Sequence, residues 1–239
     1  MAEPKKNLKI RFEGRLDNLV INYGGKVLYS YKKEKKREKG KTEKQKAAQS
    51  KTAITAAFCS QINQIPALKY SWKKWPDMER KPYRNMLAAN MRHTSPEHLT
   101  IHNIISPKSQ YEYNNFCKSV TSSEIDIRIS SQEFSSINTE NGKTFSIIVI
   151  ICFFNSKDKS KESYKLLTLC KEIENFDQLK TYNIKFQIDP EKQKEFKEYR
   201  NCIIYNTVLF SALTSGPQKW YSTYGLEFVL NKPEEDEVK

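Results

Sequence analysis

The feature that most constrains the fold of this chain is residues 144–154, in which β-branched and aromatic side chains occupy nearly every position. The apolar part, residues 147–154, is far too short to cross a bilayer as a helix. A run of this length and composition is typical of a strand that is buried on both faces. We therefore expect a buried strand here and a β-rich second half of the chain.

Further strand patterns follow residue 100 at regular spacing, separated by polar turns and without long intervening helices. They cover residues 124–130, 164–174, 182–188, 202–213 and 224–230. Residues 192–199 favour a single helical turn between two of them. This spacing predicts an antiparallel immunoglobulin/fibronectin-like β-sandwich of about seven strands.

The first half of the chain begins with patterns of short strands. Residues 9–12 can form one, and residues 19–22 and 27–31 look like the arms of a hairpin that turns at Gly24-Gly25. The glycine pair supplies the positive φ angles that such a turn needs. Residues 32–46 are rich in Lys and lack a hydrophobic period, so we expect an exposed basic arm or the solvated start of a helix.

Two short helices are predicted next. Thr42-x-x-Gln45 has the pattern of a capping box, and we expect the helix after it to bury one face and to stop at Pro66. The second helix follows Pro82. Apolar residues mark both faces: Ala47, Ile54, Phe58, Ile62 and Ile65, then Tyr83, Met86, Leu87 and Met91. Trp72 and Trp75 lie between the helices, where they either join the core or expose their rings.

Together these patterns predict a mainly β (α+β) protein. Its N-terminal hairpin and two short helices occupy residues 1–105, its antiparallel sandwich residues 106–232 and an acidic tail residues 233–239. The chain shows no signal peptide, and we expect a cytoplasmic protein or part of an assembled particle.

The charge is distributed unevenly along the chain, whose formal net charge is +13. Residues 1–51 contain 16 Lys and Arg against 6 Asp and Glu, and residues 52–120 contain 9 against 4. Residues 121–239 contain 16 basic and 18 acidic side chains, so the second half is nearly neutral. A basic field attracts polyanions at long range and concentrates counter-ions that binding releases. Nucleic acid or an acidic assembly partner is therefore the favoured partner.

The basic residues of the first half are interleaved with aromatic ones, a pattern that suits phosphate contacts and base stacking without sequence specificity. The predicted polyanion-binding residues are Lys26, Lys32, Lys33, Lys35, Lys36, Arg37, Lys39, Lys41, Lys73 and Lys74. We expect a non-catalytic binding protein that associates with nucleic acid or a nucleoprotein. The alternative is a structural subunit of a virion, tail, fibre or filament, assembled through the basic arm and the sandwich edges.

The sequence contains few residue patterns that are typical of catalytic or metal-binding sites. His98 and His102 have a spacing that suits a metal, but no third ligand has convincing spacing. Gly24-Gly25-Lys26 lacks the rest of a phosphate-binding loop and reads as a turn. The five cysteines are widely separated and contain no Cys-x-x-Cys pair, so buried free thiols are expected. We predict no catalytic residues, no metal and no cofactor.

Several short motifs carry a resemblance over nearly the whole chain. Gly14-Arg15-Leu16-Asp17-Asn18-Leu19-Val20, Gly24-Gly25-Lys26-Val27-Leu28-Tyr29 and Thr42-x-x-Gln45 resemble a bacterial domain-of-unknown-function family of small phage-like or surface-like proteins. The resemblance implies a glycine-rich basic hairpin, a helical segment with an Asn-rich end at Ala88-Ala89-Asn90-Met91, and a fibronectin-like β domain. It implies no catalytic or ligand residues, and the basic run 32–46 departs from it.

Overall fold

The computed structural model describes ten stretches of the chain, and they form two compact units, Met1–Thr42 and Glu43–Lys239. The stretches are residues 14–16, 19–24, 27–32, 42–74, 81–109, 111–113, 115–135, 143–158, 162–217 and 219–230.

The first unit contains a three-stranded antiparallel sheet in the order β1-β2-β3. Its strands are β1 (Gly14–Leu16), β2 (Leu19–Gly24) and β3 (Val27–Lys32). Gly24 pairs with Val27, so the hairpin predicted for this part of the chain is confirmed. Strand β1 was not predicted, because three residues are too few to show alternation. The strand expected at residues 9–12 lies outside the described residues.

Three helices open the second unit: α1 (Glu43–Gln64), α2 (Pro66–Lys73) and α3 (Pro82–Met91). The predicted stop at Pro66 is confirmed, since Ile65 before it has an extended backbone. Proline lacks the N–H that would continue a helix but is suited to a first turn, and both Pro66 and Pro82 take that position. Helix α2 was not predicted, because eight residues show little periodicity. Trp72 on this helix is fully buried, so it belongs to the core.

A six-stranded sheet forms the middle of the second unit, in the order β4-β11-β10-β7-β8, with β12 also paired to β10. All its pairs are antiparallel except β4 with β11. Its strands are β4 (Glu112–Tyr113), β7 (Phe145–Ser156), β8 (Tyr164–Ile173), β10 (Tyr199–Leu209), β11 (Trp220–Thr223) and β12 (Leu226–Val229).

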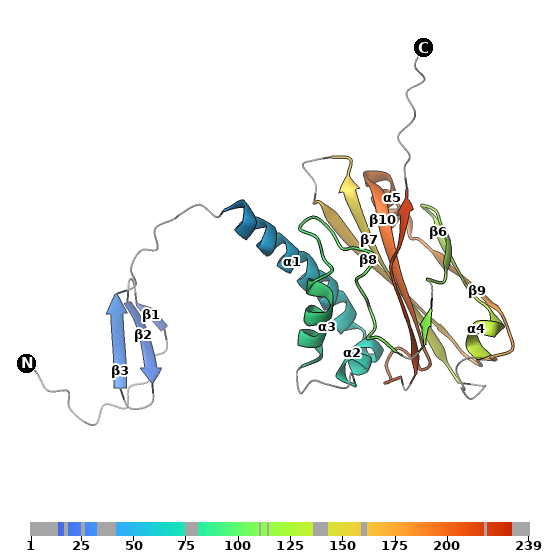
Figure 1. The fold of residues 1–239 in the computed structure, drawn as a ribbon, viewed down its shortest axis with the longest axis horizontal. Coiled ribbons are helices and arrows are strands. Elements are labelled where there is room, and N and C mark those ends of the chain that lie inside the picture. Colours follow the sequence, from blue (N-terminus) through green and yellow to red (C-terminus); the bar gives the residue numbers. More distant parts are fainter. Residues whose placement is uncertain are drawn as a thin grey trace, which may run out of the picture. The chain divides into compact units, whose positions relative to one another are not determined.

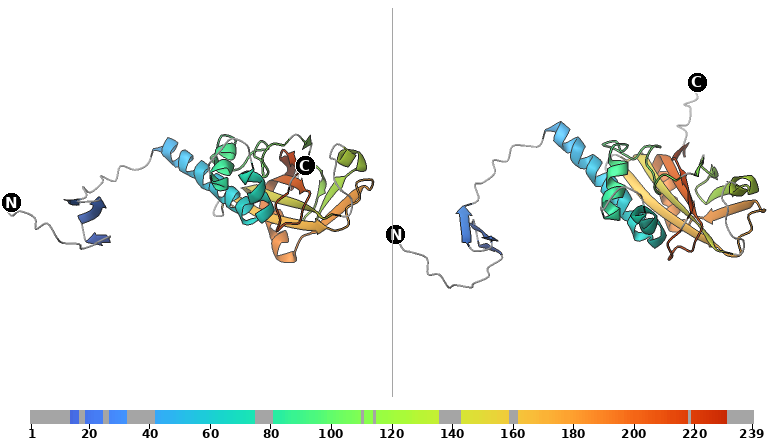
Figure 2. Two further views of the ribbon diagram at one scale, coloured as in Figure 1. Left: turned by 90° about the horizontal axis from the view of Figure 1, so that it is seen from below. Right: turned by 60° about the horizontal axis from the view of Figure 1, so that its bottom comes forward.

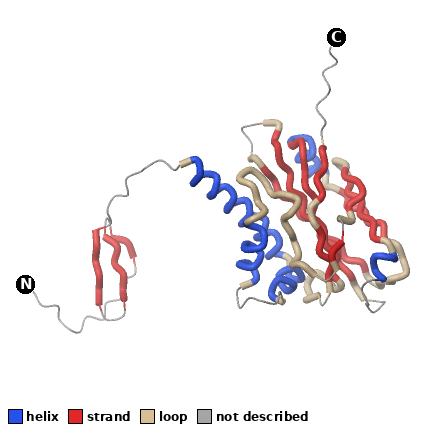
Figure 3. Tube along the Cα trace, in the orientation of Figure 1, coloured by secondary structure: helices blue, strands red, loops and turns tan. Residues whose placement is uncertain are grey.

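This sheet is covered on both faces. Helices α1–α3 lie on one side, and a three-stranded sheet lies on the other (Figures 1 and 2). Figure 3 shows the same separation of these helices from the strands. The smaller sheet consists of β5 (Cys117–Val120), β6 (Glu124–Ile129) and β9 (Tyr182–Gln187), with α4 (Ser131–Ser135) and α5 (Pro190–Glu198) in its connections.

The two cores explain the apolar run on β7. Ile147, Val149 and Ile151 pack with the smaller sheet, whereas Ile148 and Ile150 pack with the helices. Successive side chains of a strand point to opposite faces, so a strand between two cores needs apolar residues at every position. The buried strand predicted here is confirmed.

The predicted α+β class with a sandwich-like C-terminal part is confirmed, but its helices and sheets form one compact unit. The domain boundary expected at residue 105 falls inside that unit, because Ile104 and Ile105 pack in the same core as the helices and β10. The short strands β4, β5 and β11 were not predicted. Helix α5 is longer than the single turn expected at residues 192–199, because Pro190 starts it earlier.

Candidate polyanion-binding surface

Helices α1–α3 and the loop after them, residues 42–109, which together we call the helical layer, are strongly basic, whereas the rest of the second unit is not. Between residues 42 and 109 the described part contains only two acidic residues, Glu43 and Glu97. It contains ten basic ones: Lys44, Lys46, Lys51, Lys69, Lys73, Lys74, Lys81, Arg84, Arg92 and Lys108. Described residues 111–230 contain 13 basic and 14 acidic side chains. The charge separation along the sequence is thus also a separation between the helical layer and the sheets.

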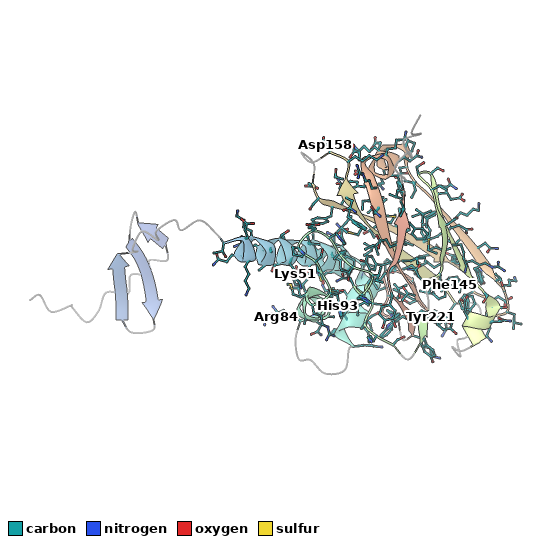
Figure 4. All side chains as sticks on the ribbon, turned by 45° about the horizontal axis from the view of Figure 1, so that its top comes forward. Lys51, Arg84, His93, Phe145, Asp158 and Tyr221 are labelled. Atoms are coloured by element: carbon teal, nitrogen blue, oxygen red, sulfur yellow. The ribbon has the colours of Figure 1, made fainter. Side chains whose placement is uncertain are left out.

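The packing of the helices explains why this charge faces solvent. Their apolar side chains, among them Phe58, Trp72 and Met86, are buried against the six-stranded sheet, so the polar positions point outward. All ten basic residues are exposed except Lys51, which is half-buried. Figure 4 shows Lys51 and Arg84 on the helical side of the second unit.

Helix α1 reaches beyond the core that holds it. No residue from Thr42 to Ala53 is buried, and Ile54 is the first buried residue of the helix. Its N-terminal half therefore projects from the body of the second unit (Figure 1). Lys44 and Lys46 are exposed on this projecting half.

Positive groups from distant parts of the sequence gather around His93, just after α3. The ring of His102 lies 6.0 Å from the ring of His93, measured between centroids. Partial burial lowers the pKa of His93, and neighbouring positive charges lower it further. Those charges belong to Arg92, His102, Lys108 and Lys51. We call Lys51, Arg92 and Lys108, together with the rings of His93 and His102, the cationic cluster.

A buried amide network holds the loop after α3, which carries every member of the cationic cluster except Lys51. Asn90, near the end of α3, accepts a hydrogen bond from the Ile104 N–H at 2.8 Å and donates one to the Ile104 carbonyl at 3.0 Å. Asn103 donates to the backbone carbonyl of Asn90 at 3.0 Å. Both amides are fully buried. Asn90 and Asn103 therefore fix the loop to α3.

Of the predicted binding residues, the side chains of Lys73 and Lys74 can be placed. Both are exposed at the end of α2, and Lys74 Nζ lies 4.9 Å above the ring of Tyr70. Lys32 ends β3. The others lie outside the described residues: Lys26, Lys33, Lys35, Lys36, Arg37, Lys39 and Lys41.

Sequence reasoning missed most of the cationic cluster. Its members come from α1 and from a loop after α3, so no single segment displays them. The only indication of this cluster in the sequence was the excess of basic over acidic residues between positions 52 and 120. That excess does not show which surface of the protein carries the charge. Trp75 lies outside the described residues.

The histidine pair considered for metal binding is not brought together with a third ligand. His98 stacks on Phe154 with a centroid distance of 4.2 Å, and so packs beside the core. In the residues that the structure describes, no group of three or more His, Cys, Asp or Glu side chains could hold a metal ion.

The thiols are suited to packing rather than to nucleophilic chemistry. Cys59, Cys117, Cys152 and Cys202 are buried, and Cys170 is exposed on β8. Burial raises the pKa of Cys59, Cys117 and Cys152 to about 12. A thiol with such a pKa carries almost no thiolate at neutral pH, and the thiolate is the reactive form.

Comparisons with family models, curated proteins and solved structures returned no match for this chain. The resemblance to a domain-of-unknown-function family therefore stays an expectation. None of the described helices is long and apolar enough to cross a membrane. The function is accordingly inferred from the charged surface itself.

Proposed function

We propose that this protein is a non-catalytic, polyanion-binding protein that associates with nucleic acid through its basic helical layer. The observation that carries the proposal is the charge separation within the second unit, where a layer with ten basic and two acidic residues lies on nearly neutral sheets. Exposed Lys and Arg side chains neutralise phosphates and release the counter-ions around them. The basic run at residues 32–46 adds further positive charge next to this layer in the sequence.

A protein that binds in this way recognises the negative charge of the nucleic acid and not its base sequence. Contacts to phosphates position a protein on nucleic acid, whereas contacts to base edges provide specificity. The helical layer contributes ammonium and guanidinium groups, so we expect similar affinities for oligonucleotides of different sequence.

The salt dependence of binding to a labelled oligonucleotide tests the proposal. With eight phosphate contacts, the logarithm of the association constant should fall against the logarithm of salt concentration with a slope of about −7 for a duplex and about −6 for a single strand. Fluorescence anisotropy between 50 and 200 mM salt, a range in which such binding weakens strongly, measures this slope. Binding that does not change over this range would contradict the proposal.

Two variants with the same net charge locate the surface. Replacement of Lys51, Arg92 and Lys108 by Ser removes three positive charges from the cationic cluster and should make the slope shallower by about 3. Replacement of Lys118, Lys194 and Lys197 by Ser removes the same charge from exposed positions outside the helical layer. If both variants lose the same affinity for the oligonucleotide, binding depends on net charge alone. That result would contradict the proposal that the helical layer is the binding surface.

A third variant tests the basic arm. Replacement of Lys32, Lys33, Lys35, Lys36 and Arg37 by Ser should weaken binding strongly, because these residues carry the densest positive charge in the sequence. Unchanged affinity would assign the binding to the helical layer alone.

Assembly into a larger structure is the second candidate, and the sheet edges favour it. In the described part of the chain, β8 and β12 each pair with a single strand, and β8 is ten residues long. Such edges offer backbone groups for strand addition. Large homogeneous particles in size-exclusion chromatography at moderate salt would support assembly, whereas a monomer that shifts only with added nucleic acid would support binding.

A further inference from the structure

An exposed ring adjoins the cationic cluster where the loop after α3 crosses the connection between β11 and β12. The Gly225 N–H donates to the carbonyl of Ile101 at 2.7 Å. A Cβ atom at Gly225 would lie 2.6 Å from a methyl group of Ile203 and 3.0 Å from the Cα of Ile101. Only glycine lets the two backbones approach this closely, and the approach brings Tyr224 beside the loop.

The sheet anchors the other side of this crossing. The hydroxyl of Tyr205 on β10 donates to the carbonyl of Thr100 at 2.7 Å, and Tyr205 itself is fully buried. Asn115 donates to the carbonyl of Tyr224 at 2.9 Å. The backbone on both sides of the crossing is therefore held in place, which limits the entropy lost when a ligand binds there.

Three rings follow one another across this surface. The centroids of His93 and His102 lie 6.0 Å apart, and those of His102 and Tyr224 lie 6.5 Å apart with the rings nearly perpendicular. Tyr224 is 43% exposed and Ile101 is 38% exposed. Single exposed apolar side chains are common on protein surfaces. Here, however, the exposed ring of Tyr224 follows the rings of His102 and His93, and the positive charges of Arg92, Lys108 and Lys51 act on His93 at the other end of this row.

We propose that this surface binds single-stranded nucleic acid, with an unpaired base stacked on Tyr224 beside His102 and the adjoining phosphates held by Arg92, Lys108 and Lys51. The proposal rests on the proposed function and goes beyond it by naming the form of nucleic acid. In a duplex the faces of the bases are covered by their neighbours, so an exposed ring adds little to the binding. In a single strand each base has an open face that can stack on an aromatic side chain.

Phosphate contacts and base stacking contribute separately to the binding free energy at such a site, so an experiment can measure each of them. Phosphate contacts depend on the backbone of the strand and are present whether or not it carries bases. Stacking requires the base. A strand of the same length and charge that lacks bases therefore measures the phosphate contribution alone.

The test compares a fluorescein-labelled oligothymidylate, an abasic strand of the same length and a duplex of the same length, all at one salt concentration. The wild-type protein should bind the oligothymidylate about tenfold more tightly than the abasic strand, as expected for one stacked base. Equal affinity for the two strands would overturn the inference but would leave the proposed function intact. Absence of binding to all three ligands would refute both.

Two substitutions at one position assign the effect to the ring of Tyr224. Tyr224→Leu removes the aromatic face and should lower affinity for the oligothymidylate about tenfold without changing affinity for the abasic strand. Tyr224→Phe keeps the ring and should match the wild type on both strands. If Tyr224→Leu weakens both strands equally while its thermal unfolding is that of the wild type, stacking on this residue is refuted.

Discussion

Asn90→Ala is expected to destabilise the second unit strongly, because one buried side chain satisfies two backbone groups of Ile104. The substitution leaves the Ile104 N–H and the Ile104 carbonyl without their bonds of 2.8 and 3.0 Å. An orphaned buried polar group costs about 1–3 kcal/mol, so the two groups together should lower the free energy of unfolding by about 2–6 kcal/mol. This is a large share of the stability of about 5–15 kcal/mol that is typical of a folded protein.

Urea unfolding followed by tryptophan fluorescence measures this loss, since Trp72 is fully buried and becomes exposed on unfolding. Asn183→Ala is the matched control, because Asn183 is exposed on β9 and its replacement should change the stability by less than about 0.5 kcal/mol. A loss at Asn90 no larger than the loss at Asn183 would refute the structural role of the amide network. Wild-type stability with reduced nucleic-acid affinity would instead assign Asn90 to binding.

Two further predictions concern the same region. Partial burial and the neighbouring positive charges lower the pKa of His93 in the folded protein. The unfolded chain therefore protonates His93 more readily than the folded protein does. The free energy of unfolding should consequently fall as the pH decreases below about 6.5, the ordinary pKa of histidine. Thermal unfolding measured at pH 7.5 and 5.5 tests this prediction, and His93→Gln should reduce the difference between the two unfolding temperatures. If the substitution leaves that difference unchanged, the pH dependence does not come from His93. Gly225→Ala should destabilise the fold by about 1–3 kcal/mol, because the new methyl group overlaps Ile203. A urea midpoint equal to that of the wild type would show that the crossing tolerates a side chain.

Several elements could be predicted from the sequence because their signals are local. The apolar run on β7 identifies a strand with two buried faces, since its β-branched and aromatic residues favour a strand over a buried helix. Pro66 and Pro82 mark helix boundaries through the missing N–H of proline. The pairing of Gly24 with Val27 follows from a glycine pair between two short apolar segments. The excess of basic residues in the first half is also a property of the sequence alone.

The short elements escaped prediction because they depend on packing. Helix α2 has eight residues, and its position is determined by Leu68 and Trp72, which are buried against the sheet. Strand β4 contains two residues and exists through its pairing with β11. Periodicity needs more residues than these elements contain.

The sequence by itself determined the longer strands and helices and where the positive charge is concentrated, since these follow from side-chain alternation and composition. Only the tertiary structure decided that the helices share a core with the six-stranded sheet, that Tyr224 lies beside His102 and His93, and that the charges of Lys51, Arg92 and Lys108 act on His93. Their proximity depends on the buried amides of Asn90 and Asn103 and on the close backbone approach at Gly225. Such contacts join residues that are far apart in sequence, and they leave no periodic pattern because each is formed by a single pair of groups.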